Sequence, residues 1–226
     1  MFLTRMALNP RRRGARPLLS SPQAMHAAVM SGFADPAPTR HGRVLWRLDT
    51  YSTHRVLLYT ASPGKPDYTH LVEQAGWPTT HTWDTRNYDT LLDTLAPGQR
   101  WQFRLTANPV HSVRLRDWAD TKPVGHVTAD QQQHWLLARA ARAGFTILPH
   151  LSARGEYQLT LAERRTHRFR RGENQVTVAT ATYEGILQVT DPDLLRHTLT
   201  HGLGRAKSYG CGLLTLAPLR PAQHQP

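Results

Sequence analysis

Four glycines and two cationic side chains lie close together near the carboxyl end of the chain, in segment 202–212. The glycines are Gly202, Gly204, Gly210 and Gly212. Glycine at this density lets a backbone adopt positive φ values and approach a neighbour closely. Arg205 and Lys207 in the same segment indicate that the neighbour is an anion such as a phosphate. The alternative is a turn whose glycines serve only the geometry of the chain, because glycine-rich turns are weak signals of function.

The segment departs from the Walker phosphate loop. A Walker loop has glycine at places where this chain has His201 and Ala206, and it leads from a strand into a helix. Here a helix capped by Asp191 is expected before the loop, and a strand over 213–217 after it. The loop would then lie at the negative end of the helix dipole. A phosphate bound there would depend on cationic side chains and loop N–H groups.

A second cationic cluster lies in segment 164–171. It consists of Arg164, Arg165, Arg168, Arg170 and Arg171, with His167 among them. Gly172 and the residues after it are typical of a turn, so the cluster is predicted on an extended β-ribbon. Arginine makes bidentate contacts to phosphate and can grip base edges, so the ribbon could follow a nucleic-acid groove. A solvated, charged edge hairpin that resists aggregation is the alternative.

The third candidate is a single imidazole. His26 is predicted on a short helix that directly follows a loop rich in arginine, with Arg13 among its members. Histidine can transfer protons near neutral pH, and the basic loop would attract phosphate. The other histidines are interpreted as mostly ordinary surface or core residues.

No metal or cofactor is expected. His197 and His201 are four residues apart on one helix face, but no third ligand is spaced nearby. No carboxylate cluster suggests Mg²⁺, and no spacing indicates a nucleophile paired with a base. The one cysteine, Cys211, excludes an intramolecular disulfide and is interpreted as a small core residue. No small-molecule ligand is expected either.

The charge balance favours a polyanionic partner. The 226 residues include 28 Lys and Arg against 16 Asp and Glu, a formal net charge of +12. Such a surplus favours nucleic acid; an anionic membrane is less favoured because no long basic amphipathic helix is evident. No run is long enough to span a membrane, and no signal peptide is recognisable. We therefore expect a soluble, cytoplasmic protein without a membrane partner.

The elements that would position these residues follow one order twice. In the first half we predict strand 2–8, helix 22–31, strands 44–49 and 55–60, helix 68–75, and a fourth strand between 83 and 92. In the second half we predict strand 101–106, a helix opened by a capping box at 128–131, strands 145–148 and 176–189, helix 194–199 and strand 213–217. This βαββαβ order is typical of ferredoxin-like domains.

We predict an α+β fold of two tandem ferredoxin-like domains. The division lies near residue 97, which gives an N-terminal domain 1–97 carrying His26 and a C-terminal domain 98–226. The basic β-hairpin is an insertion in the second domain. Segments 109–127 and 152–173 are longer than such a unit requires, and extra length on a compact scaffold is often functional.

The segment 202–214 closely resembles the C-terminal signature of the CasE family. It reads Gly-Leu-Gly-Arg-Ala-Lys-Ser-Tyr-Gly-Cys-Gly-Leu-Leu. The resemblance extends to Phe-Arg-Leu-Thr-Ala-Asn-Pro at 103–109, to Trp135-Leu136 and to Tyr-Glu-Gly-Ile-Leu at 183–187. These blocks span the second half of the chain, while the first half is similar mainly in layout and in one histidine. CasE proteins are CRISPR precursor-RNA endoribonucleases of type I-E Cascade and belong to the RAMP group of RNA-binding proteins.

The resemblance implies the same tandem fold, a CRISPR repeat RNA stem-loop as substrate, and association with other Cascade subunits. In the family a basic hairpin lies against the major groove of the stem. The family's catalytic histidine lies on the first helix, where this chain has His26. Some members have a tyrosine one helical turn earlier. Here Gln23 stands in its place, and an amide cannot supply a proton as a phenol does.

The expected reaction uses the RNA's own 2′-OH as nucleophile, which the protein aligns with the departing 5′-oxygen. His26 would act as general base or general acid. Arg205, Lys207 or Lys122 would stabilise the charge of the phosphorane. The products would be a 2′,3′-cyclic phosphate and a 5′-OH, with no metal needed. The alternative from another class is a non-catalytic RAMP-type RNA-binding subunit.

Overall fold

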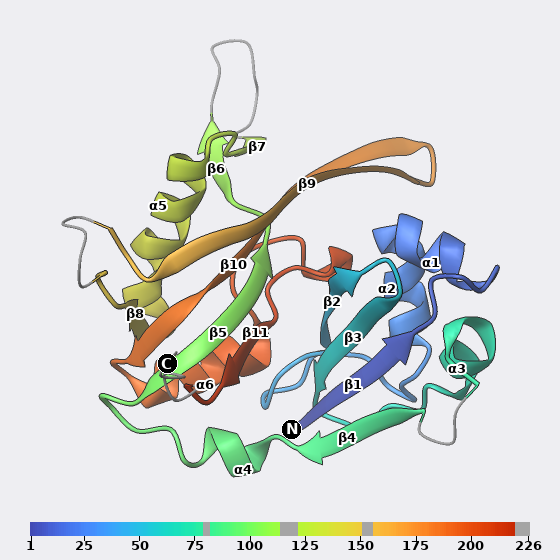
Figure 1. The fold of residues 1–226 in the computed structure, drawn as a ribbon, viewed down its shortest axis with the longest axis horizontal. Coiled ribbons are helices and arrows are strands. Elements are labelled where there is room, and N and C mark those ends of the chain that lie inside the picture. Colours follow the sequence, from blue (N-terminus) through green and yellow to red (C-terminus); the bar gives the residue numbers. More distant parts are fainter. Residues whose placement is uncertain (79–81, 114–121, 151–155, 220–226) are drawn as a thin grey trace, which may run out of the picture.

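Two antiparallel β-sheets with helices packed on them make up an α+β fold (Figure 1). The computed structural model describes residues 1–78, 82–113, 122–150 and 156–219. Within these ranges, no helix is both long enough and apolar enough to cross a bilayer. The N-terminal half of the chain forms one sheet and the C-terminal half forms the other.

The first sheet has its strands in the spatial order β2–β3–β1–β4, each antiparallel to its neighbours. They are β1 (Phe2–Leu8), β2 (Leu45–Ser52), β3 (Arg55–Ser62) and β4 (Trp83–Asn87). The helices of this half are α1 (Ala15–Ser20), α2 (Pro22–Met30), α3 (Thr69–Ala75) and α4 (Asp89–Leu92). Met6 of β1 packs with Met25 of α2 and Leu71 of α3 in one buried cluster, so these two helices cover one face of the sheet.

The second sheet has the order β11–β5–β10–β8, and β9 pairs with β10 outside that row. Its strands are β5 (Arg100–Ala107), β8 (Phe145–Ile147), β9 (Leu159–Arg171), β10 (Asn174–Val189) and β11 (Leu214–Ala217). A separate hairpin is formed by β6 (Val110–Val113) and β7 (Lys122–Gly125). The helices are α5 (Ala129–Ala140), α6 (Pro192–His201) and the 3₁₀ turns η1 (Ala141–Ala143) and η2 (Lys207–Tyr209).

Both sheets use the same connection pattern. In the first sheet β4 lies beside β1, β1 beside β3, and β3 beside β2. In the second sheet β11 lies beside β5, β5 beside β10, and β10 beside β8, which is the same pattern once β9 and the separate β6–β7 hairpin are set aside. The predicted strand–helix–strand–strand–helix–strand order is thereby confirmed in both halves, with β4 inside the window predicted for the fourth strand.

Local helix signals predict the element boundaries well. Asp191 caps α6 by accepting hydrogen bonds from the N–H groups of Asp193 and Leu194, both at 3.0 Å. Thr128 and Gln131 form the predicted capping box of α5. The helix α1 was not predicted, because six residues that include Pro17 are too few to form a stable helix by themselves. Burial of its Ala15 and Leu18 in the core stabilises it instead.

A buried arginine joins the two sheets. Arg47 of β2 is 2% exposed, and all its N–H donors are used. It donates to both carboxylate oxygens of Asp49 at 2.7 and 2.9 Å, and to the carbonyl oxygens of Arg104 and Leu213, both at 2.8 Å. The hydroxyl of Thr215 accepts the remaining bond at 2.9 Å. Strand β2 is therefore held against β5 and the start of β11, which fixes one half of the molecule on the other.

Candidate active site

His26 lies on α2 beside the carboxyl-terminal glycine-rich loop. Ser21 caps the helix, its Oγ accepting a hydrogen bond from the Ala24 N–H at 3.3 Å, and Pro22 is in the first turn. The adjacent Met25 is fully buried, whereas His26 is half-buried at the rim of the core. Because α2 packs against η2, residues from the two ends of the chain meet at this imidazole.

A pocket of about 310 Å³ opens beside His26. It is lined by α2, by the loop that follows α2, by Arg43 before β2, and by Lys207 and Ser208 of η2. Asp35 is the one carboxylate among its lining residues, against the two cations Arg43 and Lys207. The pocket therefore combines a proton-transfer group with net positive charge, as a phosphate site requires.

Trp46 of β2 contacts the same imidazole. Its indole N–H donates a hydrogen bond to Nδ1 of His26 at 3.3 Å, and the residue is 2% exposed. The backbone of Gly210 lies against the indole face, where an added Cβ would come within 2.8 Å of the ring. Gly210 of the loop thus packs against the indole of Trp46, and the indole in turn donates a hydrogen bond to the imidazole of His26.

Lys207 and Arg43 differ in how freely they could bind an anion. The Lys207 ammonium donates to the carbonyl oxygen of Gly204 at 2.7 Å, and burial, followed by the charge of Arg43, lowers its pKa. The Nε of Arg43 is buried and has no hydrogen-bond partner among the described residues. Arg43 was missed by the sequence analysis, since an isolated arginine after a turn carries no signal that places it beside His26.

The glycines of segment 202–212 serve the packing of the protein itself. All four have φ between 78° and 92°, a region that favours glycine. Gly210 packs on Trp46, and Gly204 packs under Trp135, where an added Cβ would lie 3.1 Å from the ring. An added Cβ at Gly202 would meet Leu45, and one at Gly212 would meet the backbone of Leu203. All four glycines therefore face parts of the protein itself, which supports the geometric interpretation of the glycines. Arg205 is exposed on the loop and does not line the pocket at His26.

The basic cluster lies on β9, which pairs with β10 as the predicted hairpin and extends as a long ribbon on the side of α2 (Figure 1). Strand alternation divides the cluster between two faces. Arg164, Arg168 and Arg170 share one face, where Arg164 donates to the carbonyl oxygen of Val127. Arg165 shares the opposite face with His167, so the cluster is not one continuous stripe of arginines.

Arg165 is not free to bind an anion, because it forms an ion pair with Glu163, two residues earlier on the same face. By contrast, Arg168 and Arg170 are exposed and form no ion pair within the described part of the chain. These two side chains are the ones most available to a nucleic-acid backbone.

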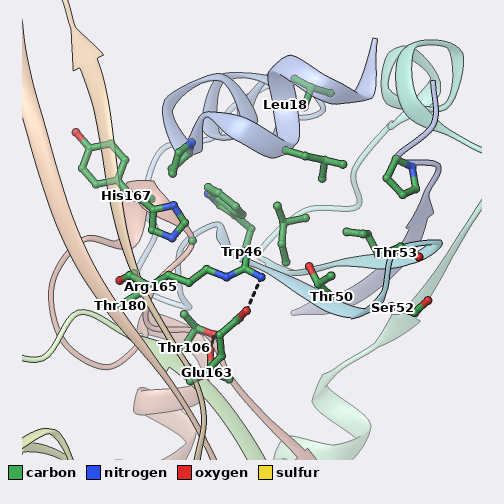
Figure 2. Close-up of a pocket in the computed structure, with 18 residues that line it drawn as sticks. Leu18, Trp46, Thr50, Ser52, Thr53, Thr106, Glu163, Arg165, His167 and Thr180 are labelled. Carbon is green, nitrogen blue, oxygen red and sulfur yellow. Dashed lines mark hydrogen bonds and ion pairs between the residues drawn. The ribbon is translucent and has the colours of Figure 1, made fainter. Parts of the chain in front are cut away.

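A second pocket of about 300 Å³ lies between the base of this hairpin and the first sheet (Figure 2). Leu18 and Trp46 line its apolar side, while Thr106 and Thr180 line the side formed by the second sheet. Figure 2 shows His167 reaching from β9 toward Trp46. Burial, followed by the charge of nearby Arg165, lowers the pKa of His167.

The remaining predicted site residues are placed as follows. Arg13 is exposed just before α1. Lys122 begins β7 and Arg171 ends β9, but both side chains lie outside the described part of the structure. Cys211 is fully buried as predicted, and burial raises the pKa of its thiol to about 12.

The predicted helix pair of histidines does not extend into a metal cluster. The rings of His197 and His201 stack at a centroid distance of 4.1 Å. Across the described ranges, no group of three His, Cys, Asp or Glu residues could hold a metal ion.

Comparisons with known proteins agree with this arrangement. A family model described as CRISPR associated protein matches residues 1–218. CRISPR-associated endoribonuclease Cse3 of Thermus thermophilus is 31% identical, over 96% of this chain and 100% of its own length. The CRISPR system Cascade subunit CasE of Escherichia coli is 32% identical over 52% of this chain and 57% of its own.

A solved structure of Cse3 bound to a 19-nucleotide RNA is also similar. It superposes with a TM-score of 0.80 at 30% identity, covering 96% of this chain and all of the other. The residues 1–218 matched by the family model span both sheets, the α2 helix with His26 and the glycine-rich loop. The chain belongs to the Cse3/CasE family of CRISPR endoribonucleases.

Proposed function

We propose that this chain is a metal-independent endoribonuclease that binds the CRISPR repeat stem-loop, cleaves precursor CRISPR RNA and stays with its product as a Cascade subunit. The observation that carries the proposal is the meeting of His26, Arg43 and Lys207 in one pocket. The full-length similarity to an endoribonuclease supports the reaction class, and the partial similarity to a Cascade subunit supports the assembly.

We further propose that each half is a ferredoxin-like domain, with the division near residue 97. The shared strand order of the two sheets supports this assignment, since one connection pattern is used twice. The N-terminal domain would contribute His26, and the C-terminal domain would contribute the hairpin and the glycine-rich loop.

The reaction would proceed by attack of the 2′-oxygen on the adjacent phosphorus. The new bond joins the 2′-oxygen to phosphorus, and the bond from phosphorus to the 5′-oxygen breaks. The 2′-OH proton passes to a base, and the departing 5′-oxygen receives a proton from an acid, with His26 serving one of these steps. Arg43 and Lys207 would stabilise the phosphorane charge. A 2′,3′-cyclic phosphate and a 5′-OH remain.

The stem of the RNA would lie along the basic hairpin. Exposed Arg168 and Arg170 would contact phosphates, because an arginine without a protein partner can donate to them without breaking an ion pair. Arg164, Arg165 and Arg171 of the same strand, together with Arg13, Arg205 and Lys122, are the further candidates for RNA contact.

A repeat RNA with a 2′-deoxy nucleotide just before the cut tests the reaction. Cleavage should vanish, because the nucleophile is gone, while affinity stays nearly unchanged. Adding EDTA to the unmodified RNA should leave cleavage intact. If the deoxy RNA is still cut, or EDTA abolishes activity, a metal-activated water replaces the 2′-OH. Binding without cleavage of the unmodified RNA would favour the non-catalytic subunit.

A further inference from the structure

We propose that Trp46 is a positioning residue for His26. The indole N–H of Trp46 donates to Nδ1 of His26, which keeps Nδ1 unprotonated and places the hydrogen of the neutral imidazole on Nε2. This inference rests on the proposed role of His26. It goes beyond that role by assigning the tautomer and the residue that sets it.

The chemistry of the contact permits one arrangement. An indole N–H donates and cannot accept. Its partner at 3.3 Å, Nδ1 of His26, must therefore present a lone pair. A neutral imidazole has one N–H, so its hydrogen lies on Nε2. The opposite tautomer and the imidazolium both place a hydrogen on Nδ1, facing the indole N–H, and both lose this bond.

The indole is held in place and cannot easily turn away. Trp46 is 2% exposed, and its strand position pairs with Thr60 of β3. Gly210 closes on its ring so tightly that a methyl group there would come within 2.8 Å. Neighbouring Tyr209 packs edge-on against Phe169 of β9 at 4.8 Å between centroids. The hairpin, the loop and the indole thus form a continuous support for the imidazole.

The charged groups around His26 favour the neutral imidazole over the imidazolium, as the indole does. Arg43 before β2 and Lys207 of η2 line its pocket, so a protonated imidazole would add a third positive charge to the lining. Asp35, from the loop after α2, is exposed and is the one carboxylate in the lining, so solvent weakens its opposing effect. For His26 to accept a proton at Nε2, its hydrogen must first move to Nδ1, at the cost of the Trp46 bond.

The chain offers a matched control in Trp135. This residue is 3% exposed and packs on Gly204 of the same loop. Its indole nitrogen is buried and has no hydrogen-bond partner among the described residues. Trp46→Phe and Trp135→Phe therefore remove the same group from similar surroundings, but only the first removes a bond to His26.

The tautomer can be measured by long-range proton–nitrogen NMR on the RNA-free protein labelled with ¹⁵N-histidine. The His26 signals are identified as those that disappear in the His26→Asn variant. In the wild type and in Trp135→Phe, Nδ1 should show the shift of an unprotonated nitrogen and Nε2 that of a protonated one. In Trp46→Phe the Nδ1–H form should gain population several-fold, on the order of 2- to 10-fold for one hydrogen bond. A protonated Nδ1 in the wild type, or identical signals in the two Phe variants, would overturn the proposal.

The rate of RNA cleavage tests whether the tautomer of His26 matters for function. The Nδ1–H form is the one that can accept a proton at Nε2, so Trp46→Phe should raise the single-turnover rate by on the order of 2- to 10-fold if His26 is the base. If His26 is the acid, its Nε2–H is positioned less firmly and the rate should fall by a similar factor. In both cases the limb of the pH profile that reports His26 should move upward, because protonation of Nδ1 no longer breaks the Trp46 bond. RNA affinity should stay constant. Trp135→Phe should leave the profile in place. A tautomer change without any change in rate or profile would overturn the positioning role. An inactive wild type would instead overturn the proposed function, while the NMR comparison would still decide the contact between Trp46 and His26.

Discussion

The chemistry of an imidazole depends on the groups around it, and those around His26 come from separate segments. Trp46 belongs to β2, Arg43 to the chain just before β2, and Lys207 to the loop after α6. Docking of α2 on η2 brings them together. At the scale of single residues, each neighbour therefore needs its own test.

Replacing the imidazole should affect chemistry far more than binding. His26→Ala should lower single-turnover cleavage of labelled repeat RNA by about 10²–10⁴-fold, the usual contribution of one acid–base group. Affinity should change little, because a half-buried imidazole contributes little phosphate binding. His167→Ala is the control, since His167 lines the neighbouring pocket. Near-normal cleavage by His26→Ala would mean that another histidine acts instead, either His167 or the exposed His111 of β6.

Arg43 should be the cation that matters most for the phosphorane. Its buried Nε has no partner among the described residues, so a bound phosphate would satisfy it. Arg43→Ala should slow single-turnover cleavage by about 10²-fold, as removal of one oxyanion donor does. Exposed Arg205 on the nearby loop provides the comparison, and its alanine variant should keep most of the rate. Equal rates for the two variants would remove Arg43 from the mechanism.

At the scale of elements, strand β9 separates its arginines by face. Arg168 and Arg170 are exposed on one face, whereas Arg165 lies on the other and is paired with Glu163. Strand alternation requires this division wherever segment 164–171 is extended. A variant that mixes both faces would therefore combine two different effects.

The hairpin should hold the RNA stem mainly through phosphates contacted by the outer pair. Each lost contact should flatten the slope of log K against log[salt] by about 0.7–0.9. Arg168→Ala with Arg170→Ala should thus reduce the slope by up to about 1.4–1.8. Arg165→Ala should reduce it less, because its charge is already balanced by Glu163. A salt titration of hairpin affinity gives the slopes; parallel lines for wild type and double variant would mean that the outer arginines do not touch the backbone.

At the scale of the whole molecule, titration of partly buried histidines couples pH to folding. Burial lowers the pKa of three histidines in different regions, His126, His167 and His201. Since the unfolded chain binds these protons more readily than the folded one, the free energy of unfolding should fall as the pH drops below about 6.5.

Urea unfolding at a series of pH values between about 7.5 and 5 would measure this loss. His167→Gln should make the fall shallower, because one of the contributing groups is removed. His126→Gln should do the same from a separate site, so the two effects should add. A wild-type stability that rises toward low pH, or slopes unchanged in both variants, would contradict the sign of these shifts.

Much of this molecule follows from the sequence because the relevant signals are local. Asp191 caps α6, and Thr128 with Gln131 opens α5, through bonds within one turn of the chain. The hairpin around Gly172 and the order of elements in both halves follow from alternation and turn residues. The glycine-rich segment and its flanking blocks also suffice to indicate the family.

Only the tertiary structure decides which distant residues share a site. Arg43 and Trp46 carry no motif, yet the docking of the two sheets and of α2 on η2 brings them to His26. Likewise α1 exists because Ala15 and Leu18 find a core to enter. Local patterns determine elements, but contacts between elements depend on how their buried faces fit together, and that fit is a property of the assembled fold.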